Sequence, residues 1–382
     1  MQQKQLIAII LVIAVVAAAA VGAVLLLKGG SSGDTKYTVT YNTNGGNEIA
    51  AKEFTKNTDT FDLATPTKDG STFLGWYLNA DFSGDKITQV VKGTEKNITV
   101  YAKWQLDLAN NTLPSAAQIT ANTDVKVTFD SGATDKTIPA AAVDELKAGK
   151  TLEVEDTVNK ITWTMSGSDS PQADCDVDTT VTPDTSLLAS EKKITLDFAY
   201  DGTLPYESTI RYFIGTDVFP AGTLISIQNS GEAEPIGQFP VDAEGYVTFT
   251  ITHCSDWVLT QYITLTLDGN GGTFTISEQT VATTTVGGNY NSDVPVLPVP
   301  SRTGYGFVPW VSPVKFTEDA TLTAQWTAHT YQVVFNKNSD AATGTMVAQD
   351  MTYDAEVALT ANAFENEGYT FAGWATSADG AV

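Results

Sequence analysis

The segment YTVTYNTNGG, residues 37–46, decides how the chain is interpreted, because it joins a β-strand to a tight turn. Tyr37, Val39 and Tyr41 alternate with threonines, and this period of two predicts a strand with one buried face. Asn44–Gly46 follows, and Asn and Gly tolerate the positive φ angles that tight turns require. The segment therefore predicts a small β module.

The same pattern occurs three times along the chain. The second copy begins with ITLTLDGNGG (residues 263–272) and the third with YQVVFNKNSD (residues 331–340). The first two copies close with an alternating strand that ends in Trp, namely ITVYAKW (residues 98–104) and ATLTAQW (residues 320–326). The structural positions that define the repeat are Gly45, Gly46, Gly75, Trp76, Trp104, Gly271, Gly272, Trp310, Trp326, Gly373 and Trp374.

These residues resemble the Listeria–Bacteroides repeat, which is also known from the B repeats of internalins. The resemblance rests on the Asn-Gly-Gly turn, the Gly-Trp pair and the terminal Tyr/Thr-Ala-x-Trp segment. The second copy departs from the pattern, since Pro309-Trp310 replaces Gly-Trp and the run to its final Trp is shorter. The resemblance implies β-grasp-like modules that are exported and set in tandem on bacterial or archaeal surface proteins.

The Trp side chains of the repeat are interpreted as core residues. In a module of about 65–70 residues, one or two Trp supply a large share of the core, so we expect packing and not an exposed ligand platform. The third copy stops at Val382 before a closing strand, which leaves an unpaired sheet edge. We therefore interpret the chain as a fragment of a longer protein.

Residues 6–27 form an unbroken run of apolar and small residues, LIAIILVIAVVAAAAVGAVLLL. As a helix this run is about 33 Å long, against a hydrocarbon core of about 30 Å. It predicts a transmembrane anchor within residues 1–28 and a linker at 29–35, with the bulk of the chain outside the cell because Lys4 precedes the run. The alternative is a cleaved signal peptide, since Ala18–Ala20 suits signal peptidase.

The middle of the chain, residues 105–260, lacks the repeat. Its segments KITWTM, KKITLDFAY, STIRYFI and GYVTFTI alternate apolar and polar residues, and the gaps are rich in Asp, Gly and Pro. This pattern predicts a β-sandwich-like domain with one short helix after Pro139. The expected fold class is mainly β, and the expected modules are repeat 1 (36–104), the central domain (105–260), repeat 2 (261–326) and the incomplete repeat 3 (327–382).

Few residues are available for catalysis or metal binding, because the chain has 2 His and 2 Cys. On a strand His253 and Cys254 point to opposite faces, so they cannot act as a base and a nucleophile. Asp174, Asp176 and Asp178 alternate, but their surroundings do not follow the EF-hand pattern and favour a solvated loop over a calcium site. We expect no enzymatic activity, no cofactor and no metal site.

Two pairs of residues are candidates for covalent modification. Cys175 and Cys254 are the only cysteines, and an oxidising compartment favours a disulfide between them, with two separate buried thiols as the alternative. The bridge would contribute roughly 4–5 kcal/mol by chain entropy. Asn97 and Asn110 lie in Asn-x-Thr sequons and are candidate glycosylation sites in a host that modifies exported Asn.

The net charge of the chain argues against nucleic acid as a partner. With 21 Lys+Arg against 45 Asp+Glu the formal net charge is −24, which provides no basic footprint for nucleic acid. We therefore predict a membrane-anchored extracellular repeat protein of the cell envelope, an adhesin-like stalk and recognition surface for an extracellular protein or glycan. A purely structural envelope component, or the non-catalytic stalk of a larger surface enzyme, are the alternatives.

Overall fold

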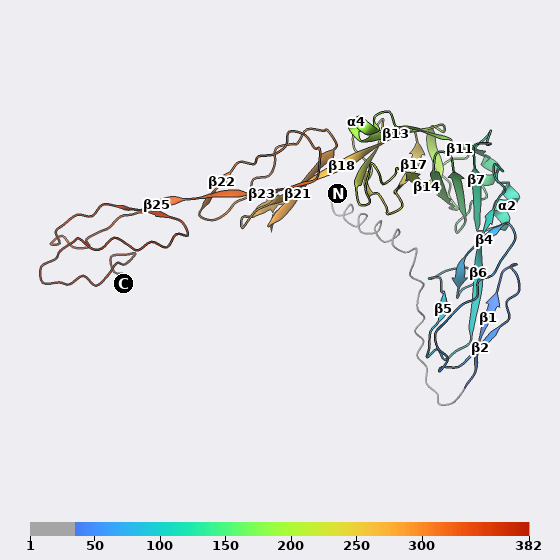
Figure 1. Cartoon of the computed structure of the whole chain (residues 1–382), viewed down its shortest axis with the longest axis horizontal. Helices are drawn as coiled ribbons and strands as arrows, with labels where there is room; N and C mark the ends of the chain where they lie inside the picture. Colours follow the sequence, from blue (N-terminus) through green and yellow to red (C-terminus); the bar gives the residue numbers. More distant parts are fainter. Residues whose placement is uncertain (1–34, 382) are drawn as a thin grey trace. The chain divides into compact units, whose positions relative to one another are not determined.

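The computed structural model describes residues 35–381 and confirms that the chain is mainly β (Figure 1). The predicted anchor at residues 6–27 lies outside the described residues. Within the described part of the chain, no helix is long and apolar enough to cross a membrane. Two compact units are present, one formed by residues up to Ser186 together with Ile194–Leu259, the other by Leu187–Lys193 together with residues from Thr260 onward.

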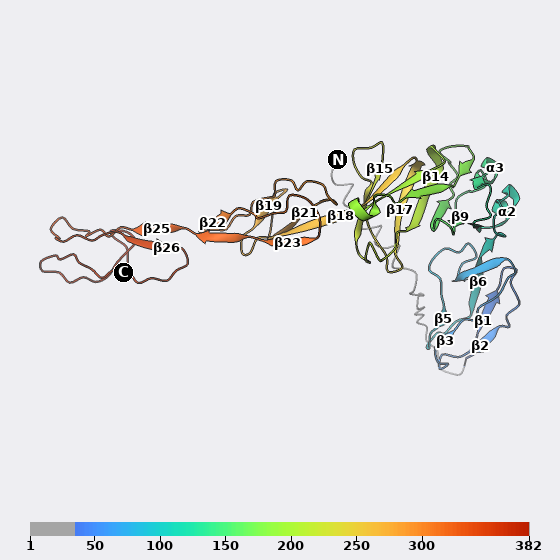
Figure 2. The same ribbon diagram turned by 45° about the horizontal axis from the view of Figure 1, so that its top comes forward.

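Repeat 1 is a strand module whose first and last strands lie side by side in parallel (Figure 2). The first strand, β1, also pairs antiparallel with β2, and the last strand, β6, pairs antiparallel with β4. Residues 37–107, all of them described, contain no α-helix, so the β-grasp-like fold implied by the resemblance stays a prediction. The strands of this module are β1 (Tyr37–Asn42), β2 (Lys52–Phe54), β3 (Phe61–Asp62), β4 (Ser71–Tyr77), β5 (Gln89–Val90) and β6 (Ile98–Asp107).

Two Trp side chains form the centre of repeat 1. Trp76 is 2% exposed and Trp104 is 8% exposed, and the ring of Phe73 lies 5.3 Å and 5.4 Å from their rings. The Nε1 of Trp76 donates to the carbonyl of Ala64, and the Nε1 of Trp104 donates to that of Thr43, both at 2.8 Å. Each ring thus packs in the core while its one polar group is satisfied by a loop carbonyl.

Gly46 lies against the ring of Trp104, so the Asn-Gly-Gly turn also leaves room for the closing Trp. A Cβ at Gly46 would sit 2.6 Å from Cζ2 of Trp104 and 2.9 Å from the carbonyl oxygen of Thr67. Repeat 2 has the same contact, because a Cβ at Gly272 would overlap the ring of Trp326. The third residue of the turn is therefore Gly because the closing Trp covers it.

We expect Gly46→Ala to lower the free energy of unfolding of repeat 1 by about 1–3 kcal/mol, the cost of overpacking a filled core. Urea denaturation followed by hydrogen exchange of residues 37–107 measures this change. In a Trp104→Phe background, where Cζ2 is absent, the added methyl group should cost less. An equal cost in both backgrounds would show that the ring is not the cause.

Repeat 2 reproduces the order of repeat 1. Its first strand, β18, pairs antiparallel with β21 and parallel with β23, and β22 pairs antiparallel with β24. The Nε1 of Trp310 donates to the carbonyl of Pro298 at 2.8 Å, as that of Trp76 does to Ala64. The strands are β18 (Trp257–Asp268), β19 (Phe274–Ile276), β20 (Gln279–Val281), β21 (Thr283–Asn289), β22 (Tyr305–Val308), β23 (Ala320–Thr323) and β24 (Gln325–Ala328).

The departure of repeat 2 from the Gly-Trp pair has a backbone consequence. Gly75 has a φ of +142° and Gly373 a φ of +152°, which Pro cannot adopt because its ring holds φ near −65°. The backbone at Pro309 therefore cannot have the positive φ of Gly75 and Gly373. The Nε1 of Trp310 nevertheless donates to the carbonyl of Pro298.

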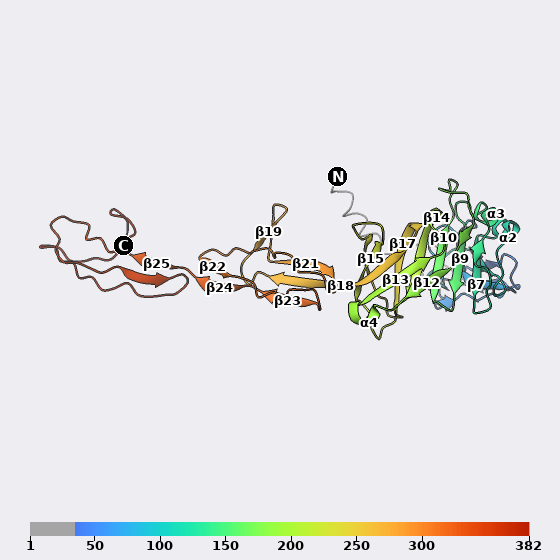
Figure 3. The ribbon, with the colours of Figure 1, turned by 90° about the horizontal axis from the view of Figure 1, so that it is seen from above.

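The central domain contains two large sheets (Figure 3), and aromatic rings of one sheet contact rings of the other. The first sheet has the order β17-β14-β10-β9-β7 within this domain and continues through β6 into β1 and β2 of repeat 1. The second sheet has the order β12-β13-β18-β15-β16. Trp163 on β10 meets Phe198 on β13 at 5.2 Å, and Phe249 on β17 meets Phe239 on β16 at 6.4 Å. The strands are β7 (Asp124–Phe129), β8 (Thr137–Ile138), β9 (Thr151–Asp156), β10 (Ile161–Ser166), β11 (Val177–Asp178), β12 (Val181–Asp184), β13 (Lys193–Phe198), β14 (Gly202–Phe213), β15 (Leu224–Asn229), β16 (Gly237–Pro240) and β17 (Tyr246–Cys254).

The structure differs from the sequence expectations in its helices and in two boundaries. The helix expected after Pro139 is α3 (Ala140–Val143), but α2 (Ala116–Ala121) and α4 (Leu188–Glu191) were not expected. The first of these begins with a capping box between Ser115 and Gln118, a local signal that predicts a helix start. The predicted boundaries at 104/105 and 260/261 fall inside β6 and β18, because neither position carries a turn residue.

Candidate functional site

The outward face of the first sheet carries a row of polar side chains that crosses four strands. Register places Glu155 of β9 beside Thr162 of β10, Thr162 beside Arg211 of β14, and Arg211 beside Thr248 of β17. Their neighbours along each strand are buried between the sheets, as Val154 and Trp163 are. The alternation of these strands therefore presents one polar face to solvent.

A shallow depression of about 240 Å³ lies beside this row and is lined from the same four strands. Its lining includes the rings of Phe213 and Tyr246, which meet edge to face at 5.1 Å. Lys160 Nζ lies 4.2 Å from the Phe213 ring and Arg211 Cζ lies 3.4 Å from the Tyr246 ring. The lining residues are Glu155, Thr157, Lys160, Thr162, Phe213 and Tyr246.

Ion pairs hold the charged groups of this face in place. Arg211 Nη2 is bonded to Asp242 Oδ2 at 2.9 Å, while Asp242 Oδ1 accepts the backbone N–H of Tyr246 at 2.8 Å. Lys126 Nζ contacts Glu153 at 2.9 Å and Glu155 at 2.7 Å. Burial alone would lower the pKa of Lys126, but its bonds to the two glutamates raise the pKa above its ordinary value. The lysine therefore stays charged at neutral pH.

The chemistry of this face suits binding. Two half-exposed rings offer apolar contact area, and hydroxyl and carboxylate groups beside them offer hydrogen bonds of both kinds. This combination fits a sugar, which has apolar C–H faces and many hydroxyl groups. Among residues 35–381 no group of three or more His, Cys, Asp or Glu is placed to hold a metal ion.

The residues around His253 form a structural cluster. His253 Nε2 lies 3.2 Å from Asn229 Nδ2, its ring lies 5.4 Å from that of Trp257, and Ser255 Oγ is also bonded to Asn229 Nδ2. Cys254 is 1% exposed, whereas His253 is half-buried on the other side of the strand. Asn229, which joins the cluster from β15, carries no local sequence signal that pairs it with β17.

The two cysteines are free thiols that both lie near Tyr200. Cys175 Sγ is 3.1 Å from Tyr200 Oη, and Cys254 pairs with Gly202, two residues beyond Tyr200. Burial and the contact with Cys175 raise the pKa of Tyr200 to about 12, and burial raises the pKa of Cys254. The disulfide stays a prediction for the exported protein.

The remaining candidate residues have local partners. Asp176 Oδ1 accepts the N–H of Ala140 at 2.7 Å, so this carboxylate caps the start of α3. Asn97 and Asn110 are both exposed, and their side chains bond to Thr38 N at 2.9 Å and to Asp130 at 3.2 Å. No bound group is needed to explain these contacts, and glycosylation at the two sequons stays a prediction.

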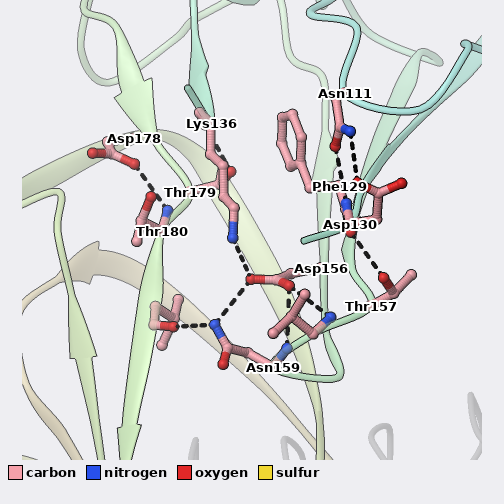
Figure 4. Close-up of polar contacts among 12 residues, drawn as sticks. Asn111, Phe129, Asp130, Lys136, Asp156, Thr157, Asn159, Asp178, Thr179 and Thr180 are labelled. Atoms are coloured by element: carbon pink, nitrogen blue, oxygen red, sulfur yellow. Dashed lines mark hydrogen bonds and ion pairs between the residues drawn. The ribbon is translucent and has the colours of Figure 1, made fainter. Parts of the chain in front are cut away.

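A buried ion pair lies in the central domain (Figure 4). Lys136 Nζ contacts Asp156 Oδ2 at 2.8 Å, and Asp156 Oδ1 accepts the N–H groups of Val158 and Asn159 at 3.0 Å and 3.1 Å. Asn159 Nδ2 bonds in turn to the carbonyl of Val181 at 2.9 Å. Burial alone would raise the pKa of Asp156, but Lys136 and these backbone donors lower it below its ordinary value.

The chain is similar to one known protein family, whose matches agree with the repeated strand pattern, and to one curated protein. The family description "Listeria-Bacteroides repeat domain" matches residues 37–103, 264–330 and 331–382, just under half of the chain. A protein of Evansella cellulosilytica described as "Putative membrane protein" is 22% identical over 364 residues, which cover 90% of this chain. The match covers 40% of that relative, so the chain spans less than half of its length.

Proposed function

Because this chain carries three Listeria–Bacteroides repeats, we propose that it is a non-catalytic stalk and recognition protein of the cell envelope, similar to an adhesin. The repeats, with a β-grasp-like topology, act as spacers, and the central domain presents the recognition face. The apolar run at residues 6–27 anchors the chain in the membrane by a single pass. The description of the Evansella relative as a membrane protein supports this location.

The observation that carries the proposal is the parallel pairing of the first and last strands of a repeat. In repeat 1 β1 pairs with β6, and in repeat 2 β18 pairs in parallel with β23, the first part of a closing segment that continues as β24. Tension applied through the two ends of a repeat pulls such strands past each other, so several hydrogen bonds must break together. A module of this kind resists stretching between an anchor and a bound surface.

Pulling geometry tests this role in a Cys175→Ser, Cys254→Ser background. We expect repeat 1 to unfold at a higher force when held through Lys36→Cys and Gln105→Cys, which loads β1 against β6 in shear. Held through Lys36→Cys and Thr55→Cys, the antiparallel pair β1 and β2 is peeled open one hydrogen bond at a time. Single-molecule force spectroscopy compares the two geometries, and equal unfolding forces would remove the support for a tension-bearing stalk.

We propose a glycan as the ligand of the recognition face, on the chemistry of the Phe213 and Tyr246 rings. Tyr246→Ala should weaken binding to a glycan array by about tenfold or more, since aromatic residues dominate such contacts. Thr250→Ala, an exposed change on the same strand, is the matched control and should leave binding unchanged. Equal loss in both variants, or binding to purified host proteins alone, would contradict a glycan ligand at this face.

The coverage of the Evansella relative favours one alternative. A chain that spans 40% of a longer relative is also consistent with the stalk of a larger surface protein whose ligand-binding or catalytic part lies elsewhere. The two functions predict different behaviour of the central domain. In a pure stalk this domain binds no ligand, so no glycan should alter the surroundings of Tyr246.

A further inference from the structure

Repeat 2 has an outward sheet face of its own, formed within the second compact unit. Register places Thr266 of β18 between Thr285 of β21 and Thr321 of β23. The residues that alternate with Thr266 along β18, Leu265 and Leu267, are buried, whereas Thr285 and Thr321 are exposed. The hydroxyl groups of the three strands therefore lie on one side of the sheet, and that side faces solvent.

A depression of about 360 Å³ opens on this face. It is lined from β18 and from the start of β23. Asp319 Oδ1 accepts the backbone N–H of Thr264 at 2.6 Å, which holds the carboxylate in place. The depression thus combines three hydroxyl groups with one carboxylate. The lining residues are Thr264, Thr266, Asp319, Ala320 and Thr321.

Repeat 1 shows how much of this arrangement the fold itself requires. Its Asn97 Oδ1 accepts the N–H of Thr38 at 2.9 Å, just as Asp319 accepts that of Thr264. The fold therefore needs a side-chain oxygen at this position, and an amide is enough to supply it. Repeat 2 has a carboxylate instead. Its second oxygen, Oδ2, has no hydrogen bond within residues 35–381 and is available as an acceptor beside the depression.

An aromatic ring lies beside the hydroxyl groups. Tyr262 of β18 covers Gly287 of β21 so closely that a Cβ there would overlap the ring. Gly287 pairs with Thr264, so the half-exposed ring borders the strand that lines the depression. In repeat 1 the residue opposite the corresponding threonine is Glu53, which forms an exposed ion pair with Lys36 at 2.7 Å. Repeat 2 thus has an aromatic ring over a glycine where repeat 1 has an ion pair.

The charges on this face disfavour acidic ligands. Asp319 is the one charged residue among the five that line the depression. Asp268, two residues beyond Thr266 on the same side of β18, is also acidic, and its Oδ1 accepts the N–H of Asn270 at 2.9 Å. The net charge of −24 adds to this negative field. The face therefore suits an uncharged ligand that has both hydroxyl groups and an apolar surface.

We propose that the outward face of repeat 2 is a second binding site, and that its ligand is a neutral glycan. The Tyr262 ring packs against the C–H face of a sugar, and Asp319 accepts hydrogen bonds from sugar hydroxyl groups. The threonine hydroxyls both donate and accept. Together with the face at Tyr246, this site gives the chain two weak contacts with one polysaccharide, which raises avidity. The two sites share no residue, so each can be tested separately.

The Tyr246→Ala chain tests the proposal, because the face of the central domain is disabled in it. On an array of neutral, amino and acidic oligosaccharides, this chain should keep weak binding to the neutral ones. Adding Tyr262→Ala should weaken that binding by about tenfold or more. Adding Asp319→Asn should also weaken it. The new amide still accepts the β18 backbone N–H, as Asn97 does in repeat 1, so the loss would not come from unfolding.

A matched pair of variants locates the site. Thr321→Val removes a hydroxyl group of the depression and should weaken binding. Thr99→Val makes the same change at the corresponding exposed position of repeat 1 and should leave binding unchanged. Unchanged binding after Tyr262→Ala or Asp319→Asn, a preference for acidic sugars, or equal loss in both valine variants would overturn the proposal. Loss of all glycan binding in Tyr246→Ala would overturn it too, while supporting the face of the central domain.

Discussion

Asp156→Ala is expected to lower the free energy of unfolding of the central domain by about 3–5 kcal/mol, because it leaves the charge of Lys136 buried without a partner. The two side chains are 15% and 5% exposed, so solvent screens the pair weakly. The change also removes the acceptor of the Val158 and Asn159 N–H groups. Urea denaturation of the full chain, with the unfolding signal taken from the central domain, measures the decrease in its free energy of unfolding.

Glu53→Ala is the matched control, since it removes one partner of the exposed pair between Lys36 and Glu53. These side chains are 70% and 63% exposed, and such surface pairs contribute little to stability because solvent screens them. Similar losses in Asp156→Ala and Glu53→Ala would show that burial of the first pair has no energetic consequence.

The same pair makes stability depend on pH in a defined direction. The pKa of Asp156 is lowered in the folded state, so its contribution is present above the ordinary Asp pKa of about 3.9 and is lost as pH falls through the folded pKa. The difference in stability between the natural chain and Asp156→Asn should therefore shrink below about pH 4. A difference that stays constant between neutral pH and pH 3 would contradict this assignment.

Trp76→Ala is expected to cost repeat 1 about 3–5 kcal/mol, the range for truncating a buried Trp. The ring is 2% exposed and lies 5.2 Å from that of Tyr41, and its removal also frees the carbonyl of Ala64. A core of this size rarely supplies more than about 3–5 kcal/mol in total, so repeat 1 should unfold. Hydrogen exchange should then become fast at residues 37–104 while the central domain stays protected.

Val311→Ala, at a position that is 94% exposed, provides the control for Trp76→Ala. Its effect should stay within about 0.5 kcal/mol, as for most surface changes. Retained protection of residues 37–104 in Trp76→Ala would show that Trp104 and Phe73 are enough to form the core.

The local features of the repeats could be predicted from the sequence because their signals lie within a few residues of each other. The alternation at residues 37–41 and the Asn-Gly-Gly turn predict a strand and a turn, and both are present. The start of α2 was also readable in Ser115 and Gln118, but it was missed. The predicted module boundaries at 104/105 and 260/261 fall inside β6 and β18, because alternation continues through both positions.

The sequence by itself therefore determined the repeated module and the mainly β class. Only the tertiary structure decided which distant residues meet. The row from Glu155 to Thr248 depends on the register of four strands, and the pair of Lys136 and Asp156 depends on a contact across 20 residues of chain. Strand register and burial result from packing between segments far apart in the sequence, so no local pattern specifies them.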